Sequence, residues 1–145
     1  MSNEFDEFVN KLQNKIIKED LKDHSKKVIN LFHNPQNWGK PPIEEISVYE
    51  EVQDEQKGDF LGLYLKIENN IIVKANFITD GCGVMIASAS EMTINITGKS
   101  IEYAKNLKPD NLINTLKGIP PDEIHCVNLA IKSLKNAIKK YEDIY

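Results

Sequence analysis

The sequence lacks arginine: all eighteen basic residues are lysine, in a chain of 145 residues with a net charge of −4. Arginine forks are the usual partners of phosphate and guanine, and a negatively charged chain has no overall positive field to attract nucleic acid. No hydrophobic run is long enough for a membrane span, and Glu4, Asp6 and Glu7 stand where a signal peptide would be positive. We therefore expect a cytoplasmic protein that binds neither nucleic acid nor a membrane.

Cysteine is also scarce, because the chain contains only Cys82 and Cys126. Two cysteines cannot form the disulfide framework of a small secreted domain, and a chain without a secretory signal is expected in a reducing compartment. In such a compartment paired thiols more often bind a metal or react than form a structural disulfide.

The hydrophobic pattern predicts one α+β core. Apolar residues at spacings of three and four predict an extra N-terminal amphipathic helix over residues 3–21. Period-two alternation predicts strands at 46–52, 60–67 and 71–79, the last two joined by a tight turn, and hence a small antiparallel sheet. Between these parts, a loop rich in Pro and Gly is expected at 34–44. Further helices are predicted at 25–32, 84–96, 100–107 and 109–116, with a final helix after the prolines at 120 and 121.

Both cysteines stand where a helix is expected to begin. Cys82 lies between Gly81 and Gly83, and Cys126 directly follows His125. Unpaired backbone N–H groups at a helix start favour the thiolate over the thiol, and an imidazole beside a thiolate suits zinc or iron. The pattern indicates a metal or sulfur site, although Cys82 would also fit an inert position in a tight turn.

Other polar residues have plainer interpretations. Asp59 opens a predicted strand and is either an oxygen ligand or an ordinary turn residue. Asp122 and Glu123 are interpreted as partners of the helix dipole in the first turn of the last helix. His24 and His33 have no potential ligand beside them in the sequence and are assigned to the surface or to packing.

Taken together, these segments resemble the iron–sulfur cluster assembly scaffolds of the IscU/NifU N-terminal type. The resemblance covers about residues 24–142 and matches both the order and the spacing of the family's motifs. It rests on residues 24–29 running into 34–39, on Lys57-Gly58-Asp59, on the segment 81–90 and on the segment 120–126.

The resemblance implies a scaffold domain at 23–145 preceded by a helical extension at 1–22. It implies a small three-stranded antiparallel sheet with helices packed on one side. By correspondence with the family, Asp59, Cys82, His125 and Cys126 bind a labile [2Fe–2S] cluster, iron or zinc. The implied protein is not an enzyme. Its implied partners are a cysteine desulfurase, assembly and acceptor proteins, and a second copy of the chain as a homodimer.

The sequence departs from the family in three places. The family's first cysteine is replaced by Lys57, whose protonated ammonium cannot ligate iron, so the usual three-cysteine set is incomplete. In many family members a dedicated chaperone recognises the segment that corresponds to 119–123. Glu123 stands where that segment has a lysine, so the charge at this position is reversed. The third departure is the helix at 3–21, which either covers the core or forms a dimer contact.

Two alternatives remain beside the scaffold hypothesis. In one, the protein is a non-assembling paralogue that binds the desulfurase or other assembly partners and holds at most a structural zinc. In the other, Cys82 is an enzymatic nucleophile with His125 as base and Asp59 as orienting group.

Overall fold

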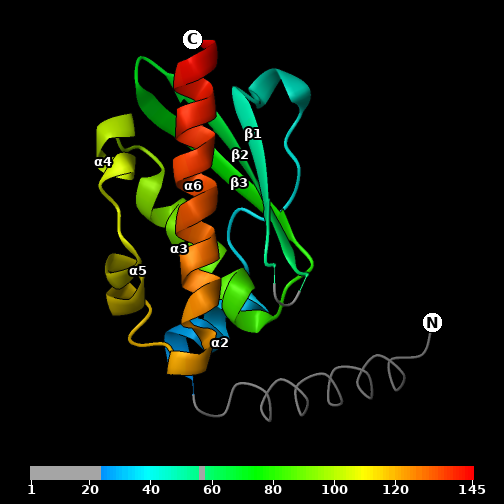
Figure 1. The fold of residues 1–145 in the computed structure, drawn as a ribbon, viewed down its shortest axis with the longest axis vertical. Coiled ribbons are helices and arrows are strands. Elements are labelled where there is room, and N and C mark those ends of the chain that lie inside the picture. The colour runs from blue at the N-terminus through cyan, green and yellow to red at the C-terminus, as the bar shows by residue number, and fades with distance from the viewer. Residues whose placement is uncertain (1–23, 56–57) are drawn as a thin grey trace, which may run out of the picture.

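The computed structural model describes residues 24–55 and 58–145. Its centre is a three-stranded sheet of β1 (Val48–Gln53), β2 (Phe60–Glu68) and β3 (Ile71–Thr79), antiparallel and in the order β1-β2-β3 (Figure 1). This arrangement confirms the predicted sheet. The predicted helix at 3–21 and the substituted position Lys57 lie outside the described residues.

Alternation along β2 places its larger apolar side chains in the core. Leu61, Leu63 and Leu65 are fully buried, and Leu63 pairs across the sheet with Phe77 of β3. The turn between β2 and β3 is made by Asn69 and Asn70, with φ angles of 53° and 63°. Asparagine tolerates this left-handed conformation, which matches the twist of a tight hairpin.

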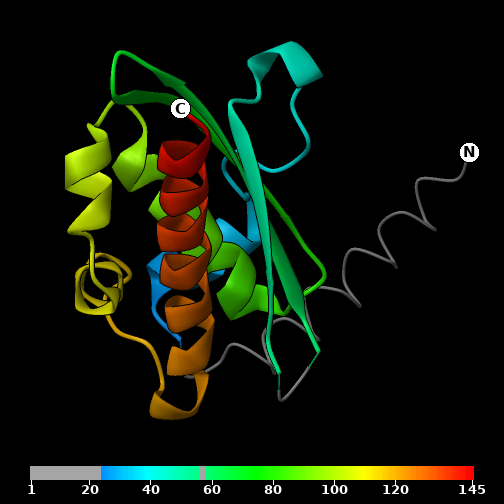
Figure 2. The same cartoon turned by 45° about the horizontal axis from the view of Figure 1, so that its top comes forward.

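Helices cover one face of the sheet, as the sequence predicts (Figure 2). The two long ones, α3 (Gly83–Ile96) and α6 (Ile124–Ile144), both contact the strands, and α2 (Lys26–His33) packs on α3. Shorter helices α4 (Ile101–Lys105) and α5 (Pro109–Thr115) flank α6, and 3₁₀ turns lie at Ile43–Glu45 and Pro121–Glu123. The helices predicted from residue 25 onward are thus present, with ends shifted by a few residues.

Small residues let α3 sit between the sheet and the other helices. Ala87, Ser88 and Ala89 are fully buried, so the helix backbone can approach its neighbours closely. The same helix carries the buried carboxylate of Glu91, which is paired with Lys27 of α2 at 2.5 Å. This ion pair fixes α2 against α3, because leaving the buried charge unpaired would be costly.

The predicted loop at 34–44 is tied to the free edge of β3. Gly39 N–H donates to the Phe77 carbonyl at 2.9 Å, and Phe77 N–H donates to the Asn37 carbonyl at 3.0 Å. The Trp38 ring stands edge-on to the Phe77 ring at 5.3 Å yet keeps 49% of its surface exposed. Trp38 therefore secures the loop to the sheet.

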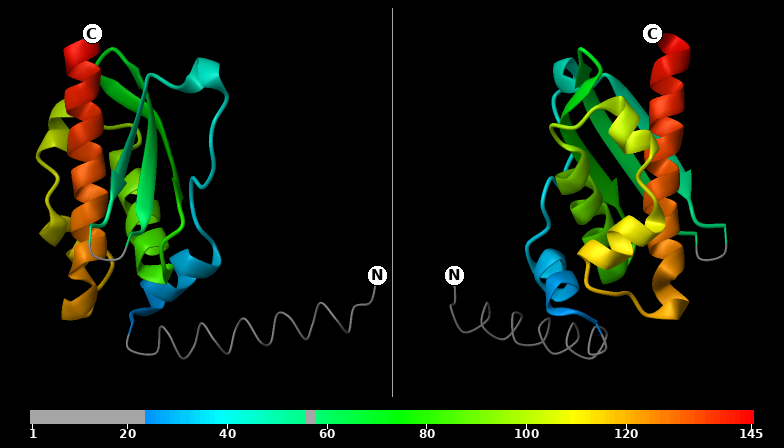
Figure 3. Two further views of the ribbon diagram at one scale, coloured as in Figure 1. Left: turned by 45° about the vertical axis from the view of Figure 1, so that its right-hand side comes forward. Right: turned by 90° about the vertical axis from the view of Figure 1, so that its left-hand side faces the viewer.

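Three chain segments meet at one end of the molecule. The starts of α3 and α6 and the paired ends of β1 and β2 all lie at the end opposite the β2–β3 turn (Figure 3). Both predicted cysteine motifs belong to this end, because Cys82 precedes α3 and Cys126 lies in the first turn of α6. Within the described ranges, no helix is long and apolar enough to cross a bilayer.

Candidate metal centre

Cys82 occupies the N-cap position of α3, as the flanking glycines indicate, and its side chain is exposed. The pKa of its thiol is lowered to about 5, chiefly by a hydrogen bond from the Cys126 thiol, which outweighs the opposing effect of partial burial. The backbone N–H groups of Val84 and Met85 lower the pKa further, while the charge of Glu123 raises it. At neutral pH Cys82 is therefore an exposed thiolate, the form that binds metal or attacks sulfur.

Cys126 and His125 lie in the first turn of α6, as the paired prolines predict. Cys126 is only 1% exposed, and its sulfur lies 3.5 Å from Nε2 of His125. The other ring nitrogen, Nδ1, lies 3.1 Å from the backbone carbonyl of Asp122. A carbonyl only accepts, so Nδ1 donates to it, and Nε2 is the ring nitrogen that faces the thiol.

A carboxylate that the sequence analysis missed completes this cluster. Asp54 follows the last residue of β1, and its Oδ2 lies 3.8 Å from Nε2 of His125. Its side chain is only 13% exposed. In the sequence, Asp54 could have been noticed only from its position at the end of a predicted strand, in the same connection as Asp59. No motif distinguished it from the neighbouring acidic residues.

Asp59 lies on the other side of the same connection. Its backbone carbonyl accepts a 2.7 Å hydrogen bond from Asp54 N–H, and its side chain is half-buried. Within the described ranges, no hydrogen bond or ion pair joins the Asp59 carboxylate to Cys82, His125 or Cys126. The structure thus brings together three of the four predicted site residues and shows no such link for Asp59.

The two thiols, the imidazole and the Asp54 carboxylate are neighbours without forming a finished metal site. Among the residues that the structure describes, no three His, Cys, Asp or Glu side chains are already arranged to hold a metal ion. Metal binding would have to displace the Cys126 proton that the two sulfurs share and draw the donor atoms inward. Such coupling of binding to deprotonation and local rearrangement is general for thiolate sites.

The structure assigns Glu123 a different partner from the predicted helix dipole. Helix α6 begins at Ile124, so Glu123 belongs to the preceding 3₁₀ turn rather than to the helix's first turn. Its carboxylate Oε2 pairs with Nε2 of His24, whose side chain is 4% exposed. His24 is therefore a packing residue, as expected, and it links the start of the domain to the segment that leads into the site.

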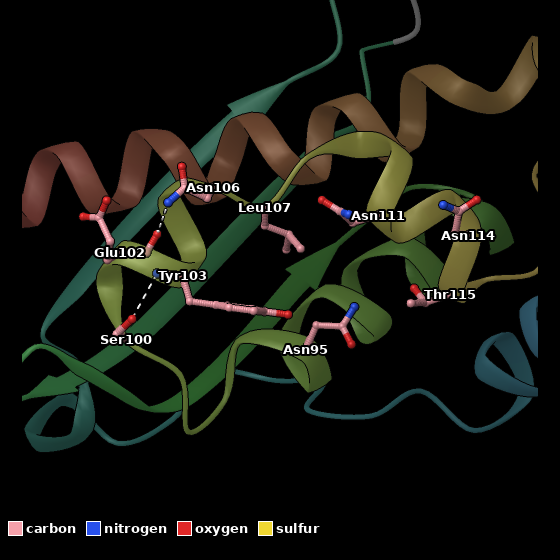
Figure 4. Close-up of a pocket in the computed structure, with 9 residues that line it drawn as sticks. All are labelled: Asn95, Ser100, Glu102, Tyr103, Asn106, Leu107, Asn111, Asn114 and Thr115. Atoms are coloured by element: carbon pink, nitrogen blue, oxygen red, sulfur yellow. Dashed lines mark hydrogen bonds between the residues drawn. The ribbon is translucent and has the colours of Figure 1, made fainter.

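A hollow among the described residues lies away from these side chains. It has a volume of about 640 Å³ and is bounded by the end of α3 and by α4 and α5 (Figure 4). Amides and hydroxyls dominate its walls, and Glu102 is the only ionisable carboxylate among the lining side chains: Asn95, Ser100, Glu102, Tyr103, Asn106, Leu107, Asn111, Asn114 and Thr115. It offers no thiol or imidazole, so the surface around Cys82 remains the candidate metal centre.

A three-stranded sheet covered on one face by helices, with two thiols and an imidazole at one end, is the arrangement expected of the iron–sulfur scaffold class. Residues 23–145 match the model of the NifU-like N terminal domain, and the chain belongs to this family. That match confirms the resemblance read from the motifs.

Curated relatives are similar in sequence to most of the chain. The iron–sulfur cluster assembly scaffold protein IscU of Aquifex aeolicus is 36% identical over 121 residues, which is 82% of this chain and 76% of that protein. IscU of Buchnera aphidicola from Acyrthosiphon pisum is 38% identical and is covered over 94% of its length, with 82% of this chain.

Solved structures share the fold. A NifU-like N-terminal protein from Brucella abortus superposes with a TM-score of 0.68 at 16% identity, covering 89% of this chain and 99% of that one. A protein described as a scaffold of the SUF system from Fervidobacterium islandicum AW-1 gives a TM-score of 0.61 at 22% identity, covering 81% and 98%. At these identities the likeness concerns the fold alone.

Proposed function

We propose that this protein is an iron–sulfur cluster assembly scaffold rather than an enzyme, and that it acts in the cytoplasm. It receives iron and sulfur, holds them as a labile [2Fe–2S] cluster, and passes the cluster to an acceptor. The cluster is cargo in this account. The observation that carries the proposal is an exposed Cys82 thiolate facing the His125-Cys126 pair, in a chain 36% identical to an IscU scaffold over 121 residues.

The chemistry of the site suits transient binding. Thiolate and imidazole are established ligands of iron and zinc, and Cys82 can be reached by a partner because it is exposed. Cys126 is buried beside it and cannot be approached from solvent in the same way. A cysteine desulfurase would deliver sulfur at the exposed side, and acceptor proteins would draw the cluster from it.

The family's third thiol is missing at Lys57, so Cys82, Cys126 and His125 must be supplemented by an oxygen ligand. By correspondence with the family motif, Asp59 is the predicted oxygen ligand. Carboxylate binds soft iron–sulfur centres less strongly than thiolate does, so the cluster should be released more readily than one held by three cysteines.

The same substitution supports a second candidate function. In that case the protein is a non-assembling paralogue that binds the cysteine desulfurase or other assembly partners and holds zinc at Cys82, His125 and Cys126. Its thiols would matter for metal content and not for partner binding. Partner affinity that survives loss of both thiols, together with zinc and no sulfide in the purified protein, would favour this candidate.

The scaffold proposal is tested by anaerobic reconstitution with ferrous iron, cysteine, a cysteine desulfurase and dithiothreitol as the reductant. The wild type should develop visible cluster absorption and then activate an apo-ferredoxin. Cys82→Ser and Cys126→Ser should develop neither signal, whereas Ser100→Ala, which lies at the remote hollow, should behave as the wild type. A wild type that gains no absorption and transfers nothing would reject the scaffold function.

A further inference from the structure

The hollow bounded by α3, α4 and α5 is lined largely by side-chain amides. Asn95 comes from the end of α3, Asn106 follows the last residue of α4, and Asn111 and Asn114 come from α5. Among the described residues, the carboxamides of Asn95 and Asn114 have no hydrogen-bond partner in the protein. Separate helices thus present amides with free hydrogen-bonding capacity to one concavity of about 640 Å³.

Tyr103 crosses this hollow. Its ring extends from α4 toward Asn95, and Nζ of Lys99 lies 5.4 Å from the centre of the ring (Figure 4). The backbone N–H of Tyr103 donates to Oγ of Ser100 at 3.0 Å, which fixes the start of α4. The side chain is exposed, and its hydroxyl has no partner within the part of the chain that the structure describes. The residue therefore offers an apolar face and a polar tip to a ligand.

The chemistry of the lining side chains favours a neutral amide as the ligand. A carboxamide offers a donor and an acceptor together, which is the complement of a peptide group. No lysine or histidine lines the hollow, so a phosphate would have no cation to pair with. Glu102 is the single carboxylate among the lining residues, which is too few for a Ca²⁺ or Mg²⁺ site.

A second hollow, of about 520 Å³, adjoins the first along α4. Glu102 lies in the walls of both. The second hollow is also lined by Lys105 of α4 and by Tyr141, Glu142 and Tyr145 at the end of α6. Each volume is in the range of about 300–1,000 Å³ that is usual for ligand pockets. Two adjoining hollows suit a linear chain, which can occupy both, better than a compact small molecule.

The second hollow favours a basic side chain of the ligand. Nζ of Lys105 is already paired with Oε2 of Glu142 at 2.6 Å, whereas Glu102 forms no ion pair within the described ranges. The rings of Tyr141 and Tyr145 lie 4.8 Å apart, and Tyr145 is exposed. A lysine or arginine would pair with the free carboxylate and lie against a tyrosine ring.

We propose that the two hollows, named the α4 groove, bind an extended peptide segment of a partner protein. The asparagines and the Tyr103 hydroxyl hydrogen-bond the peptide backbone, and a lysine or arginine of the segment pairs with Glu102. Ile101 N–H donates to the Asn70 carbonyl at 2.9 Å, so α4 is joined to the β2–β3 turn, away from the starts of α3 and α6 (Figure 1). The groove is therefore separate from the candidate metal centre and does not depend on the proposed function.

The test begins with short random peptides displayed on phage and selected against the full-length, metal-free protein. Enriched sequences should combine a lysine or arginine with neutral polar residues. The most enriched sequence is then synthesised and titrated into ¹⁵N-labelled protein. It should shift the amide resonances of residues 95–115 and 141–145, whereas those around Cys82 and His125 should not move.

Variants of the lining side chains show whether the groove makes these contacts. Tyr103→Ala should weaken binding of the peptide about tenfold, because tyrosine is among the residues that dominate binding energy at interfaces. Asn114→Ala should weaken it severalfold through lost hydrogen bonds, and Glu102→Gln should weaken peptides that carry a basic residue. The exposed controls Asn30→Ala on α2 and Glu44→Gln in the first 3₁₀ turn should bind as the wild type.

Several results would overturn the proposal. They are a selection that enriches no peptide, a peptide whose shifts fall outside the groove, and an affinity that neither Tyr103→Ala nor Asn114→Ala changes. A basic peptide that binds Glu102→Gln as tightly as the wild type would overturn the assigned ion pair. Maltotetraose and chitotetraose are titrated in parallel, and shifts in the groove with a sugar but with no peptide would replace the peptide site by a carbohydrate site.

Folding of each variant is verified by circular dichroism. If Tyr103→Ala does not fold, Tyr103→Phe takes its place, because it keeps the ring and removes only the hydroxyl. It should weaken the peptide severalfold, and unchanged affinity in both Tyr103→Phe and Asn114→Ala would overturn the proposal. Cluster reconstitution of the wild type is scored separately, so a failure of either proposal leaves the other standing.

Discussion

The thiol of Cys126 donates a hydrogen bond to the sulfur of Cys82, and this contact is the main reason that the Cys82 pKa falls to about 5. One sulfur is buried and the other exposed. The pair thus combines a shielded donor with a thiolate open to solvent, although the two residues belong to different helices. Chemical reactivity and metal binding at this end of the molecule both depend on that contact.

The pH dependence of Cys82 alkylation follows from this contact. With a lowered pKa, the thiolate predominates above about pH 5 and is lost as the pH falls through that value. The iodoacetamide rate at Cys82 in metal-free protein should therefore stay nearly constant from about pH 8 down to about pH 6, where an ordinary thiol of pKa about 8.5 has almost stopped reacting. A midpoint near that of a free cysteine would contradict the structure.

Removing the donor should reverse the effect. In Cys126→Ala the first cause of the lowered pKa is absent, so the Cys82 alkylation midpoint should move to higher pH. Cys126→Ser retains a hydroxyl donor and should keep the midpoint closer to that of the wild type. Mass spectrometry of the alkylated peptide gives both rates, and equal midpoints in the Ala variant and the wild type would argue against the contact.

Glu123→Lys, which restores the charge usual in the family, should destabilise this protein. The nearly buried His24 would lose the carboxylate that its Nε2 contacts, at a cost of about 1–3 kcal/mol in the free energy of unfolding. The variant should also lower the Cys82 pKa further, because Glu123 raises it in the wild type. Urea denaturation measures the first effect, with Glu123→Gln as the control that keeps an acceptor, and an undiminished stability of the Lys variant would be inconsistent with this contact.

Gly62 on β2 should tolerate no side chain. A Cβ there would lie 2.6 Å from Oη and 2.9 Å from Cε1 of Tyr49, whose ring also packs on Tyr64. Gly62→Ala should reduce the free energy of unfolding by about 1–3 kcal/mol through overpacking. The same substitution made in a Tyr49→Ser background should cost much less, and equal costs in both backgrounds would show that the Tyr49 ring is not the obstacle.

Lys57→Cys should stabilise the cluster by restoring the family's third thiol. Reconstituted cluster absorption should decay more slowly in the presence of a chelator than it does in the wild type, because thiolate binds iron–sulfur centres more strongly than carboxylate. Lys139→Cys adds a thiol near the end of α6 and serves as the matched control. A variant that decays as fast as the wild type would count against the alignment of this segment.

Local features of the fold were predictable from the sequence. Alternation in β2, the Asn69-Asn70 turn and the Ser100 cap of α4 each depend on neighbouring residues, and the structure contains all three. The placement of Cys82 at a helix start was predictable for the same reason, since glycine on both sides favours a sharp turn there.

Contacts between distant segments could not be predicted in this way. His24 and Glu123 are 99 positions apart, and nothing in either segment indicates that they meet. The juxtaposition of Asp54 and His125 likewise depends on how the end of β1 packs beside the start of α6. The family motif predicted Asp59 as a site residue. The contact between Asp54 and the His125 imidazole is visible only in the folded structure.

The most direct test of the account is the metal and acid-labile sulfide content of the full-length protein purified without oxygen from iron-replete cells. The account predicts iron and sulfide in equal amounts in the wild type, and loss of both in Cys82→Ser and in Cys126→Ser. Protein that contains neither, or thiol variants that retain the same iron and sulfide as the wild type, would contradict it.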